Sequence, residues 1–186
     1  HTRFKCDWSS DVCSSDLRHL TARNHEIRAL RSSLRVGQGE LHLPDLEADT
    51  DVATLKASVH VGLGEHKLLR VEQLRLDGMD LARALPEFGV RGVTGEMGLL
   101  HGFIKLDLAR WRDSLELDGD LWGKDVVVSG HALPELSAHL SAHGQRFRLD
   151  DGDVRLWNDR LVVLSGEYHL GSGRFEANVN WPTTAL

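Results

Sequence analysis

The chain has 186 residues, 41% of them hydrophobic, and a formal net charge of −6 at pH 7. This length is compatible with one domain that buries a sizeable core, and the negative charge argues against nucleic acid as a partner. No apolar run approaches the roughly 20 residues that a membrane-spanning helix needs.

The N-terminal segment differs in character from the rest of the chain. Its residues 6–17, CDWSSDVCSSDL, resemble one reading frame of a sequencing adapter. We therefore interpret His1–Leu17 as a non-native, disordered scar and expect residues 18–186 to form a single β-rich domain that is truncated at both ends. Both cysteines, Cys6 and Cys13, lie in the scar, so the sequence predicts neither a disulfide nor a thiol site.

Hydrophobic and polar residues alternate along most of the chain from Ile27 onward, as is typical of strands with one buried face. The pattern is clearest where every second residue is apolar: Ala53, Leu55, Ala57, Val59 and Val61. Gly37-Gln38-Gly39 predicts a turn between two earlier strands, and Gly171-Ser172-Gly173 predicts another near the C-terminus.

Two interruptions of this alternation are expected. The apolar residues change parity between Val71 and Leu74, which predicts a β-bulge near Gln73. Residues 79–88 have helical spacing, and Asp80 can cap the N-terminus of a helix of about two turns.

The stretch from Arg146 to Gly166 predicts three short strands. Asp151-Gly152 and Asn158-Asp159 are candidates for two-residue hairpin turns. Closing both turns would place Leu149, Val154 and Val163 on one apolar face. Strands that recur with glycine-rich punctuation favour an all-β, mostly antiparallel meander with one short helix over an α/β fold.

Side chains that could carry chemistry are scattered. His139 and His143 would lie on one face of a strand but about 13 Å apart, too far for a single metal ion. Asp150, Asp151 and Asp153 lack the ligand spacing of a calcium loop. No nucleophile elbow, phosphate loop or dinucleotide motif is present, so we predict no catalytic residue, no metal, no cofactor and no enzymatic activity.

One basic patch is predicted on the wet face of the Arg146–Gly166 strands. Its candidates are Arg146, Arg148, Arg155 and Arg160. Such a patch could contact anionic headgroups or an acidic partner, but we favour the interpretation as a solvated outer face, because such sheet faces are normally charged.

A family resemblance extends over most of residues 27–181. The succession ALRSSLRVGQGELHLPDLEAD, LKASVHVGL and VEQLRLDGMDLARAL, followed by LDGDLWG and LDDGDVRL, resembles the AsmA/TamB group of bacterial envelope proteins. The resemblance implies an elongated, curved sheet that forms an open apolar groove. It also implies a role in phospholipid transport or outer-membrane lipid homeostasis, on the periplasmic side of the inner membrane, with a membrane contact through an N-terminal anchor that is missing here.

In that interpretation the groove binds phospholipid acyl chains. The candidate lining residues share the parity of the apolar positions: Leu55, Val59, Val61, Ile104, Leu106 and Leu108. The alternative is a closed β-sandwich that serves as an interaction or scaffold module of a secretion or envelope assembly system. The two differ in whether the apolar face stays open or is buried against a second sheet.

Overall fold

The structure is a computed structural model that describes residues 2–7, 12–22, 25–64, 67–88, 91–155 and 161–180. Side chains are described from residue 25 onward, apart from residues 87, 88 and 161. The strands are β1 (Thr2–Asp7), β2 (Val12–Ala22), β3 (His25–Gly37), β4 (Glu40–Thr50), β5 (Thr54–Gly62), β6 (Leu68–Asp80), β7 (Val93–Asp107), β8 (Glu116–Val128), β9 (His131–His143), β10 (Arg146–Arg155), β11 (Leu161–His169) and β12 (Arg174–Asn180). The helical pieces are α1 (Leu81–Ala84), a 3₁₀ turn (Leu85–Phe88) and α2 (Trp111–Ser114).

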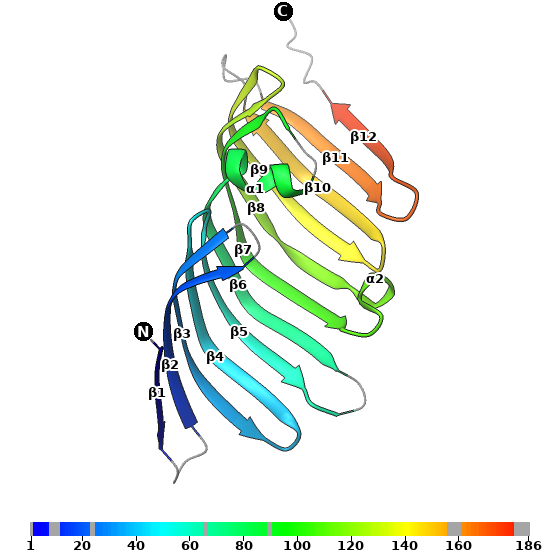
Figure 1. Ribbon diagram of the computed structural model, residues 1–186. Coiled ribbons are helices and arrows are strands. Elements are labelled where there is room, and N and C mark those ends of the chain that lie inside the picture. Colours follow the sequence, from blue (N-terminus) through cyan, green and yellow to red (C-terminus); the bar gives the residue numbers. More distant parts are fainter. Residues whose placement is uncertain are drawn as a thin grey trace, which may run out of the picture.

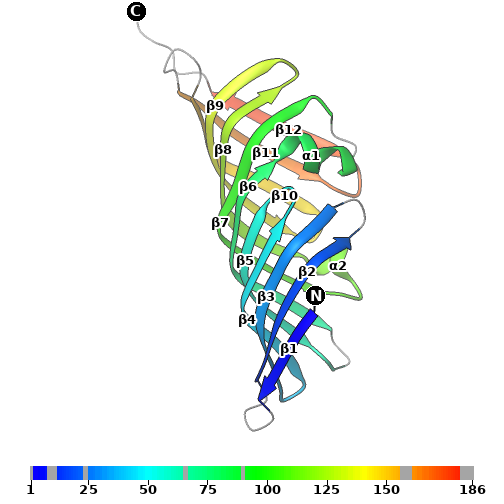
Figure 2. The same cartoon turned by 60° about the vertical axis from the view of Figure 1, so that its left-hand side comes forward.

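The strands form one sheet in which each strand pairs with the strand before it in the chain, in the order β1 to β12. The pairs are antiparallel, so the chain is a meander. The sheet is open, with β1 and β12 at its two edges. It is elongated and bowed, with α1 against its inner side (Figures 1 and 2).

This architecture confirms the predicted all-β meander and shows that the alternative, a closed β-sandwich, is wrong. Each turn returns the chain to the edge of the same sheet, so the described strands build one layer and no second sheet. The alternation in the sequence is the same in both folds, because it records only that one face of each strand is apolar.

Cross-strand register keeps apolar residues on one side of the sheet, which we call the apolar face. Leu55 pairs with Leu76, and Val71 pairs with Val59 on one side and Ile104 on the other. The opposite side carries pairs such as Lys56 with Arg75, and we call it the polar face. Register is set this way because a slip by one residue would move every apolar side chain to the polar face.

The bulge predicted near Gln73 is confirmed. Gln73 has a φ of 52°, and the pairing of β5 with β6 shifts between Lys56 and Ser58 opposite it. The extra residue reverses the parity of β6, so that Val71 and Leu74 both lie on the apolar face.

The predicted hairpin turn at Asp151-Gly152 is wrong, because these residues form a second bulge within β10. Asp151 has a φ of 49°, and the pairing with β9 shifts between Asp150 and Asp153. A two-residue turn and a bulge both bring Leu149 and Val154 to one face, and both favour residues that tolerate positive φ. The local sequence therefore fits either structure.

The prediction that Val163 shares the apolar face with Val154 is also wrong, by one residue. Val154 pairs with Val162, which is buried, whereas Val163 is exposed on the other side of β11. The second predicted turn, Asn158-Asp159, lies outside the described residues. The turn predicted at Gly37-Gln38-Gly39 is confirmed, since Gln38 and Gly39 both have the positive φ that a tight hairpin requires.

Residues 1–17 are interpreted from the sequence as a disordered, non-native segment, but residues 2–7 lie in β1 and residues 12–17 begin β2. β2 pairs with β3 over its whole length. The exposed edge of a sheet offers unpaired N–H and C=O groups to any neighbouring segment, whatever its side chains are. The non-native origin of residues 1–17 stays a prediction.

The predicted helix begins at Leu81 rather than Met79, because Met79 and Asp80 complete β6. Asp80 is the N-cap, as predicted: its carboxylate accepts a hydrogen bond from the backbone N–H of Ala82 at 3.0 Å. Leu81 is only 1% exposed and is the one fully buried large side chain among the described residues. It fixes α1 to the sheet.

Candidate functional site

The apolar face is the most extensive chemical feature of the described chain. Its centre is a cluster of Ala57, Leu74 and Leu99, which are each buried. The surrounding side chains are partly buried and come from four neighbouring strands: Leu55, Val59, Val71, Leu76, Ile104 and Leu121. The face continues onto β9 and β10, where Ala142 pairs with Phe147 and Leu140 with Leu149.

Five of the six predicted groove residues lie together on this face. Val59, on β5, and Ile104, on β7, are both cross-strand partners of Val71 on β6. Val61 and Leu106 are in the same way both partners of Leu69. Leu55 lies on the same side of β5 and packs against the central cluster.

The sixth residue, Leu108, does not belong to the sheet. It follows the end of β7, and its backbone N–H donates to the carbonyl of Lys67 in the neighbouring connection at 3.0 Å. Its side chain is 45% exposed. The alternation of residues predicted that Leu108 lies on the apolar face, but β7 ends at Asp107, one residue before Leu108.

Four apolar residues of β6, which were not among the predicted groove residues, join the two halves of this surface. They are Leu69, Val71, Leu74 and Leu76. Strict alternation along β6 would place Leu69 and Val71 on one face and Leu74 and Leu76 on the other. The change of parity at Gln73 was the signal that could have placed all four on the apolar face, since a bulge there brings them to one side.

The polar face is covered by pairs of opposite charge. Lys56 contacts Glu47 at 2.6 Å across β4 and β5, and Lys105 contacts Glu116 at 3.0 Å across β7 and β8. The Lys56 ammonium lowers the pKa of Glu47 by donating a hydrogen bond to it. These exposed pairs keep the face soluble and contribute little stability each.

A histidine on β9 lies between two carboxylates of β8. His139 Nδ1 is 3.1 Å from Asp120 and Nε2 is 3.1 Å from Asp118, while His101 Nδ1 is 3.3 Å from the other oxygen of Asp120. The hydrogen bond to Asp120, with further help from Asp118, raises the pKa of His139. The hydrogen bonds from His139 and His101 lower the pKa of Asp120.

The sequence did not predict this cluster, because His139 was considered as a metal ligand only together with His143. Its members come from three strands and meet through register: Asp120 pairs with His139 and Asp118 with Ser141. Within the described ranges, no group of three or more His, Cys, Asp or Glu side chains could hold a metal ion. The arrangement is therefore an ion-pair network.

A pair of stacked histidines, separate from the His139 cluster, lies on the polar face of β4 and β5. The rings of His42 and His60 stack with centroids 3.9 Å apart, and His42 Nε2 is 3.2 Å from the Ser58 hydroxyl. Burial is the main cause of the lowered pKa of His42, and the nearby His60 and Arg35 lower it further. The stacked His60 ring and the Arg35 guanidinium both disfavour a positive charge on His42.

The predicted basic patch is neutralised by neighbouring acids. Arg146 lies 3.1 Å from Glu167, Arg148 lies 2.8 Å from Asp150, and Arg155 lies 3.4 Å from Glu135. All three arginines are on the polar face of the single strand β10. Arg160 lies outside the described residues.

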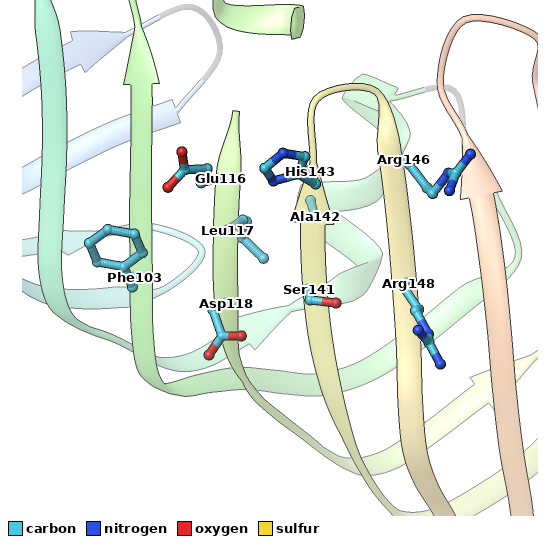
Figure 3. A pocket seen from close by; sticks show the side chains of 9 residues that line it. All are labelled: Phe103, Glu116, Leu117, Asp118, Ser141, Ala142, His143, Arg146 and Arg148. Atoms are coloured by element: carbon cyan, nitrogen blue, oxygen red, sulfur yellow. The ribbon is translucent and has the colours of Figure 1, made fainter. Parts of the chain in front are cut away.

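A shallow hollow of about 510 Å³ lies on the polar face over β7 to β10. Figure 3 shows Phe103 at one side of it and Arg148 at the other, with Glu116, Asp118 and His143 between them. Its charged and titratable groups are carboxylates on β8, an imidazole on β9 and arginines on β10, and both arginines already have acidic partners. The hollow therefore has no single charge with which to select a ligand.

No helix in the described part of the chain combines the length and the apolar character needed to span a bilayer. No family model, curated protein or solved structure matches the chain. The resemblance to the AsmA/TamB group therefore stays a prediction, and the function has to be argued from the geometry of the two sheet faces.

Proposed function

We propose that this chain is a non-enzymatic segment of a bacterial cell-envelope protein whose apolar face binds phospholipid acyl chains. Its role in this proposal is phospholipid transport or outer-membrane lipid homeostasis on the periplasmic side of the inner membrane. The observation that carries the proposal is a continuous aliphatic face on an open, one-layer sheet.

An aliphatic face in water is costly, because each square ångström of exposed apolar surface costs about 25 cal/mol. Folded domains normally bury such a face under helices or a second sheet. Among the described residues, only α1 and its 3₁₀ extension lie over this side, and they lie at the ends of β6 and β7 that they connect (Figure 2). Contiguous apolar surface of this kind marks a site for a ligand or partner.

The shape and chemistry of this surface suit a long, flexible hydrocarbon. Val59, Val71 and Ile104 form one row across three strands, and Val61, Leu69 and Leu106 form the next. Aliphatic rows without buried polar groups offer van der Waals contacts but no hydrogen bonds to fix a ligand's orientation. An acyl chain needs no hydrogen bonds, and it can slide from row to row.

The proposal is tested by native mass spectrometry and lipid extraction on the full chain, purified from bacteria without detergent. We expect co-purified phospholipid in the wild type and loss of most of it in Val59→Asp and Ile104→Asp. Thr94→Asp is the matched control, because it places the same charge on β7 but on the polar face, opposite Val127. Circular dichroism of each variant checks that folding is intact.

Wild-type protein that is free of lipid and unfolds cooperatively would overturn the proposal. Retention of lipid in both apolar-face variants would overturn it as well, because the bound lipid would then lie elsewhere.

The second candidate function is an interaction module, and edge strand β12 favours it. All residues of β12 are exposed, including Phe175 and Val179 on the apolar side. An exposed edge with apolar side chains is a template for strand addition by a partner. A lipid-free chain that forms a dimer, lost on replacing Val179 by Lys, would favour this candidate.

A further inference from the structure

Exposed apolar side chains lie at most of the hairpin turns on one long side of the sheet. This side contains the β3–β4, β5–β6, β7–β8, β9–β10 and β11–β12 connections, which follow one another from the bottom to the top of the right side of Figure 1. Large apolar side chains protrude at or beside four of these connections: Val36 (48% exposed), Leu63 (54%), Leu108 (45%), Trp111 (44%) and Leu170 (37%). We call these five residues the turn rim.

Backbone hydrogen bonds join successive turns of the rim. Leu63 donates to Gly39 at 2.8 Å, Leu108 donates to Lys67 at 3.0 Å, Gly144 donates to Leu115 at 2.7 Å and Leu170 donates to Gln145 at 2.8 Å. Neighbouring hairpins in such a sheet are about 10 Å apart. The rim is thus a continuous edge, and four of its five connections carry exposed apolar side chains.

The middle of the rim combines apolar and cationic groups. Leu63, Leu108 and Trp111 lie in two adjacent connections that also carry Lys67 and Arg112. The Arg112 guanidinium lies 5.3 Å from the centre of the Trp111 ring. A tryptophan with an apolar body and a polar N–H, flanked by basic residues, is suited to the interface between lipid headgroups and acyl chains.

We propose that the turn rim docks on the surface of a phospholipid bilayer. Leu63, Leu108 and Trp111 insert into the headgroup region, and Lys67 and Arg112 contact lipid phosphates. The rim uses different residues from the acyl-chain site under Proposed function, so the two proposals can fail separately. Membrane binding of this kind scales with the buried apolar area and with attraction to anionic lipids.

The opposite long side supplies a control. Val128, at the end of β8 next to the Ser129-Gly130 turn, is 40% exposed and so resembles Leu108 in exposure. Val128→Asp changes the net charge as much as an aspartate on the rim does. A difference in vesicle binding between Val128→Asp and a rim variant therefore reports on the position of the aspartate and not on net charge.

The experiment is co-sedimentation of the full chain with two kinds of vesicle: phosphatidylcholine alone, and equal parts phosphatidylcholine and phosphatidylglycerol. We expect the wild type to bind both, with the tighter binding to the anionic vesicles weakened by salt. Leu63→Asp and Trp111→Asp should each lower the partition coefficient by about tenfold on both vesicles, and Val128→Asp should change it by less than about twofold.

Lipid content in native mass spectrometry separates this proposal from the preceding one. Rim variants should retain co-purified phospholipid, and Val59→Asp should lose it while still sedimenting with vesicles. Three results would overturn the docking proposal: a wild type that does not sediment, an equal loss of binding in Val128→Asp, or a vesicle-independent dimer that the rim variants abolish. The last result would assign the rim to contact with a second copy of the chain.

Discussion

His139 is held by carboxylates on both sides of its ring. A neutral imidazole carries one N–H and can donate to only one of them, whereas the imidazolium donates to both. The contacts with Asp120 and Asp118, at 3.1 Å each, therefore favour the charged ring. Its pKa is raised for this reason, and the pKa of Asp120 is lowered by the same hydrogen bonds.

The resulting pH dependence follows from the direction of the two shifts. A raised pKa of His139 stabilises the folded state below its unfolded value of 6.5, and this stability is lost as pH rises through the folded pKa. A lowered pKa of Asp120 stabilises the folded state above its unfolded value of 3.8, and this is lost as pH falls through the folded pKa. The hydrogen bonds between His139 and Asp120 therefore stabilise the folded state most between pH 3.8 and pH 6.5.

We predict that His139→Asn lowers the melting temperature by a few degrees at about pH 5.5 and by less at about pH 8.5. Thermal unfolding followed by circular dichroism at the two pH values measures the difference. His143→Asn is the control, because His143 lies on the same face of β9 and its ring makes no hydrogen bond or ion pair among the described residues. Equal losses at both pH values for His139→Asn would contradict the prediction.

At the scale of an element, α1 is attached to the sheet by two buried side chains and by polar contacts at its ends. Leu81 supplies the larger buried contact and Ala84 the smaller one. Asp80 caps the first turn, and Arg83 forms an ion pair with Asp51 in the β4–β5 connection. A helix of one turn has almost no stability of its own. Its position over the apolar face therefore depends on tertiary contacts.

We predict that Leu81→Ala lowers the free energy of unfolding by about 2–4 kcal/mol, because it removes a fully buried side chain and leaves a cavity. Urea unfolding measures the change. Leu63→Ala removes the same atoms from a side chain that is 54% exposed, and we expect it to cost less than about 1 kcal/mol. Similar losses for the two variants would show that α1 is not anchored by Leu81.

At the scale of the whole molecule, the sheet is a one-dimensional array in which each strand contacts mainly its sequence neighbours. Stability in such an array varies with position, because each strand is held only by the strands beside it. The buried cluster lies on β5, β6 and β7, whereas β12 has one neighbour and exposed side chains throughout.

We therefore predict graded hydrogen exchange, with amides of β12 exchanging at least about tenfold faster than those of β6 and β7. Exchange measured by mass spectrometry on peptides from the native chain tests this. Equal protection across the described strands would contradict it and would indicate that a partner or second layer covers β12.

Much of the local structure could be predicted from the sequence. Alternation identified the strands, and the parity change identified the bulge at Gln73. The positive φ that Gln38 and Gly39 adopt was signalled by the glycines around that turn. These features follow from interactions between residues close in the chain, namely the period-two geometry of a strand and the steric freedom of glycine.

The tertiary structure decided which surfaces these strands create. Asp151-Gly152 suits a turn or a bulge, and only the pairing of β10 with both β9 and β11 made it a bulge. His139 meets Asp118 and Asp120 through the register of β8 with β9, across a sequence separation that no local pattern reports. Whether the apolar face stays open likewise depends on where each hairpin adds its strand. Alternation determines that a strand has an apolar side, but long-range pairing determines what that side faces.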